Sequence, residues 1–476
     1  MTPNTTNDPA MKIAQGTQET DVTPVENDEL STSLSPSTQP KKPNTPTREL
    51  FALAIPALGT LVAAPLLLAA DTAMVGYLGT TPLAGMSIAS TIVATLVYVF
   101  IFLTYTTTAE AARLLGKGDQ PAAVRTGIDG MWLGAALGLA LAPITFLAGP
   151  ALVNLMGAEG DVAAQAVTYL RFTSFGLIGM CVVLAGNGAL RGLMDARTPF
   201  YVSLGGAVAN VILNATFMYG LSMGIAGAGL GTALAQTGMA ATLIAVVARG
   251  ARRLQVPIKP DGRGTLSSFT HGMPLLLRTV ALRACLVVTV MAATVLGPLT
   301  LAAHQVMLAI YALFSYPADA FGIGAQSLVG HALGTDSRGR FTQVRRTTVV
   351  SGLITGGVLG LVLACVSPWI SYAFTPDVAI REAIPVSVLL MAVLLPVSSL
   401  VFVLDGILIG ADQAWFMAKA TVMTFVMYAP VVLGLAHYLA TAETSPQWSL
   451  LALWASFMLV FLGSRALANT YKSWRL

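Results

Sequence analysis

Residues 198–248 read TPFYVSLGGAVANVILNATFMYGLSMGIAGAGLGTALAQTGMAATLIAVVA, a run of 51 residues without Asp, Glu, Lys or Arg. A helix that crosses the hydrocarbon core of a bilayer needs roughly 20 residues, so this run is long enough for two crossings. Because backbone polar groups in lipid must be hydrogen-bonded within the chain, both crossings must be helices. The glycines and polar residues from Tyr219 to Gly227 predict the turn that joins them.

The whole chain shares this apolar composition. Of its 476 residues, 55% are hydrophobic and only 10% are charged, against roughly 25% charged residues in an average soluble domain. This deficit excludes a soluble globular protein and a disordered chain. It also excludes a nucleic-acid partner despite the net charge of +4, because the basic residues lie between apolar spans. The partner that the composition implies is the lipid bilayer.

The apolar runs predict an all-α polytopic membrane protein with twelve transmembrane helices, at about 20–30 residues per helix. We place these helices at 50–75, 83–112, 123–148, 162–189, 199–219, 227–248, 268–294, 299–333, 344–367, 380–410, 416–440 and 447–468. Residues 1–47 differ, since they are rich in Thr, Pro, Asn and Ser and contain no aromatic residue. Such a segment cannot bury enough apolar surface to fold, and it lacks the apolar core of a secretory signal. We therefore predict a disordered cytoplasmic tail.

The basic residues indicate how the spans are oriented. With both termini in the cytoplasm, 22 of the 26 Lys and Arg residues, Arg191 and Arg465 among them, fall on cytoplasmic loops and termini. Only two fall on the outer side, and two more, Arg278 and Arg283, are embedded in spans. This bias predicts a multi-pass protein of the cell inner membrane with both termini cytoplasmic.

The two halves of the chain match at a constant offset of 218 residues, which indicates an internal repeat. The aligned pairs include Pro56 with Pro274, Gly79 with Gly297, Gly116 with Gly334, and Asn187 with Asp405. Each half holds six helices, an even number, so the halves run in the same sense, as in transporters built from two parallel repeats. We predict two six-helix bundles, at 48–248 and 268–470, a cytoplasmic linker at 249–267, and a cytoplasmic C-terminus at 471–476.

An ionisable side chain at membrane depth is a functional candidate, because burying it is costly unless it is paired or hydrated. Asp71 lies toward the outer end of the first helix, and no basic residue of the first bundle shares its depth. Four polar residues reach the same depth on other helices and could line one pocket with it: Tyr169, Asn210, Asn214 and Thr232. The spacing of Asn210 and Asn214 puts both amides on one helix face.

A low dielectric favours the neutral form of a carboxyl group, so Asp71 can take a proton from outside and release it inside. The alternative is an Asp that only hydrogen-bonds a neighbour and locks a helix pair. Pro56 and Pro65 each remove a backbone hydrogen bond from the same helix. The helix then bends when Asp71 is protonated, or it carries a static kink.

The second bundle carries its own embedded ionisable residues, namely Arg278, Arg283, His304, Asp319 and Asp405. The charged members of this set are expected to pair with one another as structural salt bridges, since paired burial is the usual fate of such groups. For His304 we expect packing or hydrogen bonding. No metal-ligand spacing and no catalytic motif such as HExxH or GxGD is present, so we expect neither a metal site nor an enzyme.

Several motifs resemble the multidrug and toxic compound extrusion (MATE) family. ADTAMVGYLG at 70–79 looks like the first-helix signature of that family, and ALRGLMDARTP at 189–199 resembles its motif after the fourth helix. LAAHQ at 301–305, GAQSLVGHALG at 324–334 and LDGILIGAD at 404–412 look like the second-half versions. The last two, together with Asp319, resemble the DinF (DNA-damage-inducible protein F) branch. The resemblance covers about residues 48–470.

The resemblance implies two bundles in a V about a central cleft, and an antiporter that exports organic cations or other drugs against protons or sodium. Pro56 would be the bend and Asp71 the coupling carboxylate. Tyr169, Asn210 and Thr232 match the polar wall of the cavity by position, and we expect Asn187 and Asn214 to belong to the same wall. Where this branch often has a second Asp on the fifth helix, this chain has Asn214, which favours coupling to a single proton, with Na⁺ as the alternative. We expect no other cofactor, a small-molecule substrate, and a monomer.

Other readings remain open at this point. A lipid-linked saccharide flippase of the same superfamily is supported by Arg278 and Arg283, because such proteins have cationic central cavities. A sodium-coupled drug exporter is the second alternative. An intramembrane enzyme would need paired catalytic groups at one depth, and Asp71 has no second carboxylate there. Isolated acids in place of a ring of charges argue against a channel.

Overall fold

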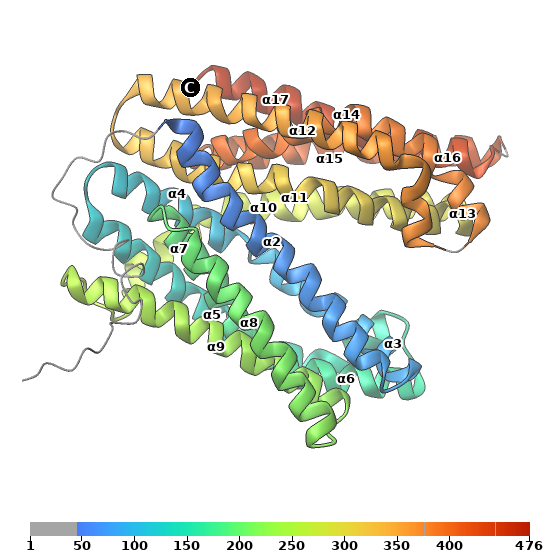
Figure 1. The fold of residues 1–476 in the computed structure, drawn as a ribbon, viewed down its shortest axis with the longest axis horizontal. Helices are drawn as coiled ribbons and strands as arrows, with labels where there is room; N and C mark the ends of the chain where they lie inside the picture. The colour runs from blue at the N-terminus through green and yellow to red at the C-terminus, as the bar shows by residue number, and fades with distance from the viewer. Residues whose placement is uncertain (1–44, 376, 443) are drawn as a thin grey trace, which may run out of the picture. The chain divides into compact units, whose positions relative to one another are not determined.

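A computed structural model describes residues 45–375, 377–442 and 444–476 (Figure 1). Residues 1–44 of the predicted tail lie outside the described residues. The described helices of the first half are α2 (Pro46–Gly76), α3 (Thr80–Val99), α4 (Phe102–Gly116), α5 (Gln120–Leu155), α6 (Gly160–Ser174), α7 (Leu177–Gly192), α8 (Arg197–Ala215), η1 (Thr216–Gly220) and α9 (Ile225–Arg253). Those of the second half are α10 (Gly262–Val295), α11 (Pro298–Gly334), α12 (Arg338–Phe374), α13 (Val378–Ala383), α14 (Pro385–Gly410), α15 (Ala414–Thr441), α16 (Pro446–Ala455), η2 (Ser456–Leu462) and α17 (Gly463–Trp474).

The described helices agree with the predicted number of spans. Eleven are long and apolar enough to cross a membrane, and the count is twelve if the bent pair α6 and α7 forms one span. The turn predicted between Tyr219 and Gly227 is confirmed, since η1 ends at Gly220 and α9 begins at Ile225. The chain is therefore an all-helical, multi-pass membrane protein.

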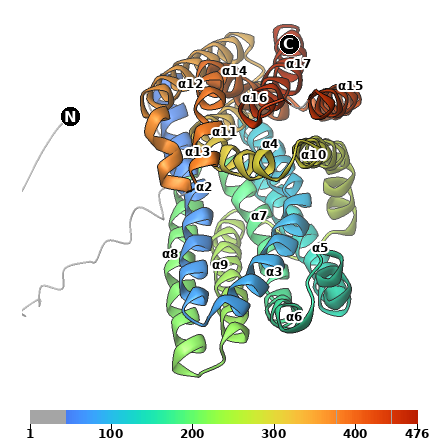
Figure 2. The ribbon, with the colours of Figure 1, turned by 90° about the vertical axis from the view of Figure 1, so that its right-hand side faces the viewer.

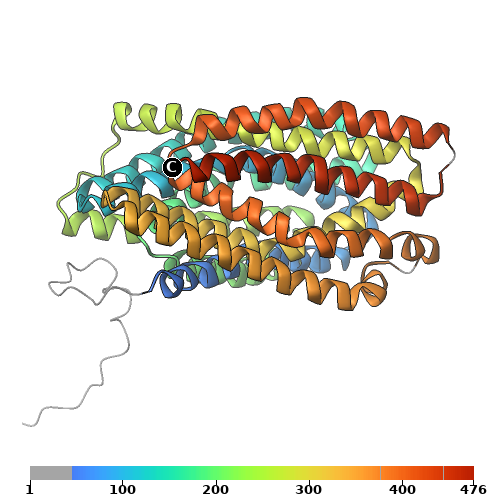
Figure 3. The same cartoon turned by 90° about the horizontal axis from the view of Figure 1, so that it is seen from above.

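The helices pack as two sets, which we call the first bundle (α2–α9) and the second bundle (α10–α17). Within the first bundle, α5 packs on α7, α8 on α9 and α2 on α8, and Figure 2 shows α2 and α8 side by side. Within the second bundle, α14 packs against α11, α12 and α17, and α10 against α15. Figure 3 shows these long helices running alongside one another. The bundles meet where α11 contacts α2 and α4, and where α10 contacts α4 and α5.

Several helices predicted as continuous are interrupted in the structure. The predicted helix 162–189 is two helices, α6 and α7, bent by 53° at a short break. Gly176 lies in this break, and a Cβ there would come within 2.7 Å of the Ala233 Cα on α9, so the chain turns where its backbone packs closely. The predicted helix 83–112 breaks between α3 and α4, and the predicted helix 380–410 breaks between α13 and α14. In contrast, α2 is continuous although Pro56 and Pro65 lie inside it.

The internal repeat has a structural counterpart where α4 crosses α11. Gly116 and Gly334, which the repeat aligns, face each other at this crossing. A Cβ on Gly334 would lie 2.8 Å from the Gly116 Cα, and a Cβ on Gly116 would lie 3.0 Å from the Gly334 Cα. Only glycine permits two helix backbones to approach so closely. The repeat-related glycines thus bring the two bundles into contact.

The connection between the bundles is shorter than predicted. The predicted linker spans 249–267, but α9 continues to Arg253 and α10 begins at Gly262. The short segment between them is held against α5, because Arg125 donates hydrogen bonds to the carbonyls of Pro257 at 2.6 Å and Lys259 at 3.0 Å. Trp132 Nε1 also donates to the Ile258 carbonyl at 3.0 Å.

Candidate functional site

The first bundle contains a chain of hydrogen bonds that ends on Asp71. Asn214 Nδ2 donates to Asp71 Oδ1 at 2.8 Å and to Asn210 Oδ1 at 3.1 Å. Asn210 Nδ2 in turn donates to Thr232 Oγ1 at 3.1 Å. Three helices, α2, α8 and α9, therefore meet through four side chains that the sequence placed at one depth.

Tyr169 of α6 completes this group, which we call the Asp71 pocket. Its side chain is buried beside Thr232 and close enough to Asp71 for an electrostatic interaction. The structure thus brings together five of the residues predicted for the cavity wall and the coupling site. Asn187, the remaining wall residue, belongs to α7 and has no hydrogen bond to the pocket residues; its Oδ1 is buried without a partner among the described residues.

A glycine on α9 makes room for the amide at the centre of the pocket. A side chain on Gly231 would overlap Asn214 Oδ1 and lie 3.0 Å from the Asn214 backbone nitrogen. Asn214 is fully buried, and its Oδ1 has no hydrogen-bond partner within the described part of the chain. The close approach of α8 and α9 therefore positions the amide that contacts Asp71.

Few groups around Asp71 would stabilise a negative charge on its carboxyl group. Its side chain is only 6% exposed, and the amide of Asn214 is its one hydrogen-bond donor among the described residues. Asp71 also forms no ion pair within this part of the chain. An ionised carboxylate buried in this way is costly, and binding a proton removes that cost.

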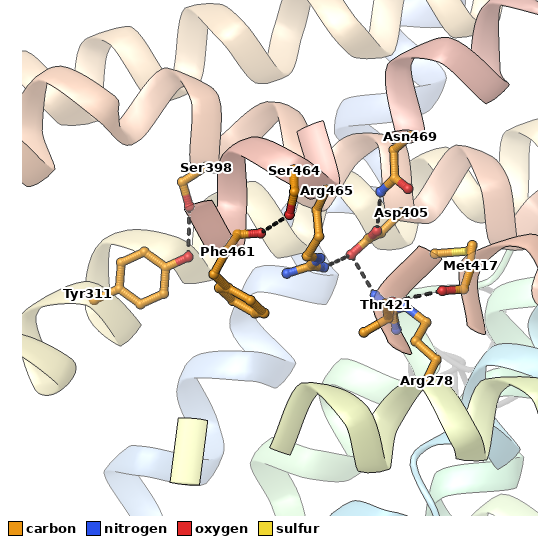
Figure 4. A network of polar contacts seen from close by, with 10 residues as sticks. All are labelled: Arg278, Tyr311, Ser398, Asp405, Met417, Thr421, Phe461, Ser464, Arg465 and Asn469. Atoms are coloured by element: carbon orange, nitrogen blue, oxygen red, sulfur yellow. Dashed lines mark hydrogen bonds and ion pairs between the residues drawn. The ribbon is translucent and has the colours of Figure 1, made fainter. Parts of the chain in front are cut away.

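In the second bundle, the buried carboxylate of Asp405 has several hydrogen-bond donors, two of them charged (Figure 4). Arg278 Nη2 donates to Asp405 Oδ2 at 2.5 Å, and Arg465 Nη2 donates to the same oxygen. Asn469 Nδ2 donates to Asp405 Oδ1 at 2.7 Å. We call these four side chains, from α10, α14 and α17, the Asp405 network. The predicted ion pairing is confirmed for Arg278 with Asp405 and is wrong for Asp319, which forms no ion pair within the described residues.

The other predicted charges of the second bundle do not join this network directly. Arg283 places its guanidinium 3.6 Å from the ring centre of Tyr98 on α3, so it contacts the first bundle through a cation–π interaction. The prediction that Arg283 pairs with an acid is therefore wrong for the described residues. His304 is buried against Trp454, with ring centres 5.7 Å apart, and neither ring nitrogen has a partner there. Packing is confirmed for His304, and hydrogen bonding is not.

Two arginines counted as cytoplasmic loop charges are in fact buried in helices. Arg465 lies in the Asp405 network, and Arg191 of α7 is only 6% exposed. The spacing of each arginine from an asparagine is the signal in the sequence that points to this burial. Arg465 lies four residues before Asn469, and Arg191 lies four residues after Asn187, so each pair shares one helix face.

The described residues offer no cluster of three or more His, Cys, Asp or Glu side chains that could hold a metal ion. The two buried sites are instead a lightly bonded carboxylate in one bundle and a fully bonded one in the other. A membrane protein of two repeated helix bundles with such an intramembrane carboxylate has the architecture of a secondary transporter.

Comparison with known proteins agrees with this class. The MatE family matches the chain twice, at residues 56–216 and 274–433, and the two matches begin at the offset of the internal repeat. The chain therefore belongs to the MatE family of transporters, and the fold and family are not those of an enzyme.

Individual relatives cover most of the chain. It is 29% identical over 443 residues to Protein DETOXIFICATION 44, chloroplastic, of Arabidopsis thaliana, covering 90% of this chain and 82% of that protein. It is 26% identical over 435 residues to DNA damage-inducible protein F of Escherichia coli K12, covering 88% and 90%. The structure of an outward-facing multidrug resistance MATE family transporter superimposes with a TM-score of 0.78 at 18% identity, covering 94% and 98%.

Proposed function

We propose that this chain is a secondary antiporter that exports organic cations or other drugs across the cytoplasmic membrane in exchange for protons. In this proposal the two bundles expose the substrate site to one side at a time. Both termini lie in the cytoplasm and the protein acts as a monomer. The coupling ion is the proton, with Na⁺ as the alternative, and no other cofactor takes part.

The environment of Asp71 is the observation that carries the proposal. A carboxylate that is 6% exposed, accepts one amide hydrogen bond and has no ion pair among the described residues is stabilised when it binds a cation. A proton satisfies this need completely. The proton and a cationic substrate then compete for the same negative charge, which is the requirement for exchange.

Asn214 supports the proton over sodium. Its side chain is an amide, so the Asp71 pocket holds a single carboxylate, and one proton neutralises it. A sodium ion would need several oxygen ligands around Asp71. The Asn214 amide nitrogen, however, faces the carboxylate and would have to turn away.

The substrate class rests on the relatives. The chain shares its fold with a multidrug resistance transporter and most of its length with proteins of the MatE family. The buried Met218, 2% exposed beside the pocket helices, adds an adaptable apolar side chain of the kind that accommodates varied ligands. Bulky organic cations are therefore the first substrates to test.

The test is transport in proteoliposomes with ethidium as the probe. An imposed pH gradient drives uptake with and without sodium, and wild type is compared with Asp71→Asn. Asp336→Asn is the matched control, because Asp336 is exposed at the end of α11 in a left-handed conformation that Asn tolerates.

We expect the wild type and Asp336→Asn to accumulate ethidium without sodium, and Asp71→Asn to lose this accumulation at least about tenfold, within the range of coupling effects. Gradient-driven transport that persists in Asp71→Asn would show that Asp71 has only a structural role. Transport that requires a sodium gradient would identify Na⁺ as the coupling ion. A wild type that moves no cation would exclude this substrate class.

A further inference from the structure

A second carboxylate, Asp319, lies in the middle of α11 where this helix faces the first bundle. It forms no hydrogen bond or ion pair within the described residues, and it is half-buried. Gln326, seven residues further along the same face, donates to the Tyr105 carbonyl of α4 at 2.6 Å. The face of α11 that carries Asp319 is therefore the face that contacts the first bundle.

A basic residue of the opposite bundle acts on Asp319 electrostatically. Of the charged groups that act on Asp319, Arg191 of α7 has the strongest influence, and Asp319 has the strongest influence on Arg191. α7 and α11 are in contact. The two side chains nevertheless do not form an ion pair, and the Arg191 Nε is buried with no partner in the described chain.

We propose that Asp319 is a second proton-binding site, located between the bundles, and that Arg191 is the partner that takes the place of the proton. In the conformation seen here, Asp319 holds a proton and stands apart from Arg191. When the bundles move, the O–H bond of the carboxyl group breaks, the proton leaves to water, and the carboxylate forms an ion pair with the guanidinium. Loss of the proton changes the total charge of the two side chains from +1 to 0, so the buried pair is neutral.

The physical reason is that polar groups of α7 and α11 lack partners in this conformation. A buried arginine without a carboxylate partner is costly, and nearly all such groups in native structures are satisfied. Asn187 Oδ1, one turn before Arg191 on the same face, is also without a partner among the described residues. Both the donor and the acceptor on α7 thus lack partners in this conformation, as expected if their contacts form in another one.

A pocket reaches Tyr105, a residue that interacts with Asp319. A cavity of about 190 Å³ is lined by Tyr105 of α4 and extends to Gly264 near the start of α10 and to Asp412 just after α14. The proposed orientation places those helix ends in the cytoplasm. Tyr105 interacts electrostatically with Asp319. Polar side chains line the cavity between these ends, among them Thr106, Ser267 and His271.

Other titratable groups around Asp319 come from three further helices. Asp405 of α14 disfavours a second negative charge, while Arg278 of α10 favours it, and these two groups already pair with each other. Tyr105 comes from α4, and Tyr316 lies on α11 itself. Of the two arginines that act on Asp319, Arg278 is already paired with Asp405, and Arg191 forms no ion pair within the described residues.

The first test measures proton binding directly and does not depend on any substrate. Purified protein in unbuffered detergent solution is acidified from about pH 8 to about pH 5, across the usual range of perturbed carboxyl groups, and the protons bound per molecule are counted with an indicator dye. We expect Asp319→Asn to bind about one proton fewer than wild type. Asp336→Asn serves again as the control and should match wild type.

The proton count distinguishes a failure of the inter-bundle site from a failure of the proposed function. If Asp71→Asn matches wild type while Asp319→Asn loses a proton, the proposed role of Asp71 fails and the inter-bundle site stands. If Asp319→Asn binds as many protons as wild type, the inter-bundle site is wrong, whatever Asp71→Asn does.

The second test concerns the pairing with Arg191 and rests on the proposed proton-coupled transport. We expect Asp319→Asn to lower pH-driven ethidium accumulation roughly tenfold, while exchange without a gradient changes less than about twofold. Arg191→Gln should give the same pattern, and the double variant should lose no more than either single variant, because the two residues act as one pair. Arg191→Lys keeps the charge and should restore part of the accumulation. Additive losses, or equal losses of exchange and accumulation, would contradict the pairing.

Discussion

Asp71 in the first bundle and Asp405 in the second are both buried carboxylates, 6% and 7% exposed, yet their surroundings are opposite. Asp405 accepts hydrogen bonds from two arginines and an asparagine, so both of its oxygens are bonded and its charge is more than balanced. Asp71 accepts one hydrogen bond from a neutral amide and has no ion pair among the residues that the structure describes.

The difference shows which carboxylate can change its charge. A buried carboxylate between two guanidinium groups is held in its ionised form. Protonation would remove the negative charge that balances the two buried positive charges. A buried carboxylate that only an amide contacts has no such constraint. The Asp405 network is thus suited to hold α10, α14 and α17 together, and the Asp71 pocket to bind and release a cation.

Removing the carboxylate of the Asp405 network should have the largest effect on stability. Asp405→Asn leaves Arg278 and Arg465 facing a neutral side chain in a buried site. Breaking a buried pair in this way costs about 3–5 kcal/mol. Thermal unfolding of the purified protein in detergent should show a large drop in the midpoint, while Asp336→Asn leaves it unchanged. An Asp405→Asn protein as stable as wild type would show that the network does not hold the bundle together.

Removing the neutral donor of the same network should cost less. Asn469→Leu deletes the hydrogen bond to Asp405 Oδ1 and keeps both arginines. A hydrogen bond to a charged group contributes about 1.5–3 kcal/mol. The unfolding midpoint should therefore fall by less than in Asp405→Asn. Equal losses in the two variants would mean that the arginines add little beyond the amide, and the contrast with Asp71 would disappear.

Much of this comparison could be predicted from the sequence. The uncharged runs give the number of spans, and depth along each helix brings Asp71, Asn210 and Asn214 to one pocket, because spanning helices cross a layer of fixed thickness. Depth says nothing about rotation around a helix axis. The stacking of Arg283 on Tyr98 depends on that rotation, so it could not be predicted.

The helix breaks and the burial of charges near helix ends could not be predicted from the sequence either. Arg465 lies at the end of an apolar run, where a basic residue normally faces water, and only the packing of α17 on α14 turns it toward Asp405. The bend between α6 and α7 has no proline at the break and depends on the close approach of Gly176 to α9. Tertiary packing decides such features.

Disturbing the geometry of the Asp71 pocket should have a moderate effect. Gly231→Ala places a methyl group against Asn214 Oδ1 and pushes the amide away from α9. Overpacking of this kind costs about 1–3 kcal/mol. Gly238→Ala on the same helix is the matched control, because a Cβ there meets no atom within 4 Å. If both variants unfold at the same temperature, Gly231 does not position Asn214, and the hydrogen bond to Asp71 has another origin.

Neutralising Asp71 should have the smallest effect on stability. In Asp71→Asn the side-chain oxygen can still accept the hydrogen bond from Asn214 Nδ2, and no buried arginine loses a partner. We expect the free energy of unfolding to change by less than about 1 kcal/mol, the worth of an ordinary hydrogen bond. Thermal unfolding of Asp71→Asn and Asp405→Asn in the same detergent measures the contrast, since the chemical change is identical and only the surroundings differ. A loss of stability in Asp71→Asn as large as in Asp405→Asn would mean that the native protein holds Asp71 as a compensated charge. Asp71 would then be a structural residue, and proton coupling would have to reside elsewhere, with Asp319 as the next carboxylate to examine.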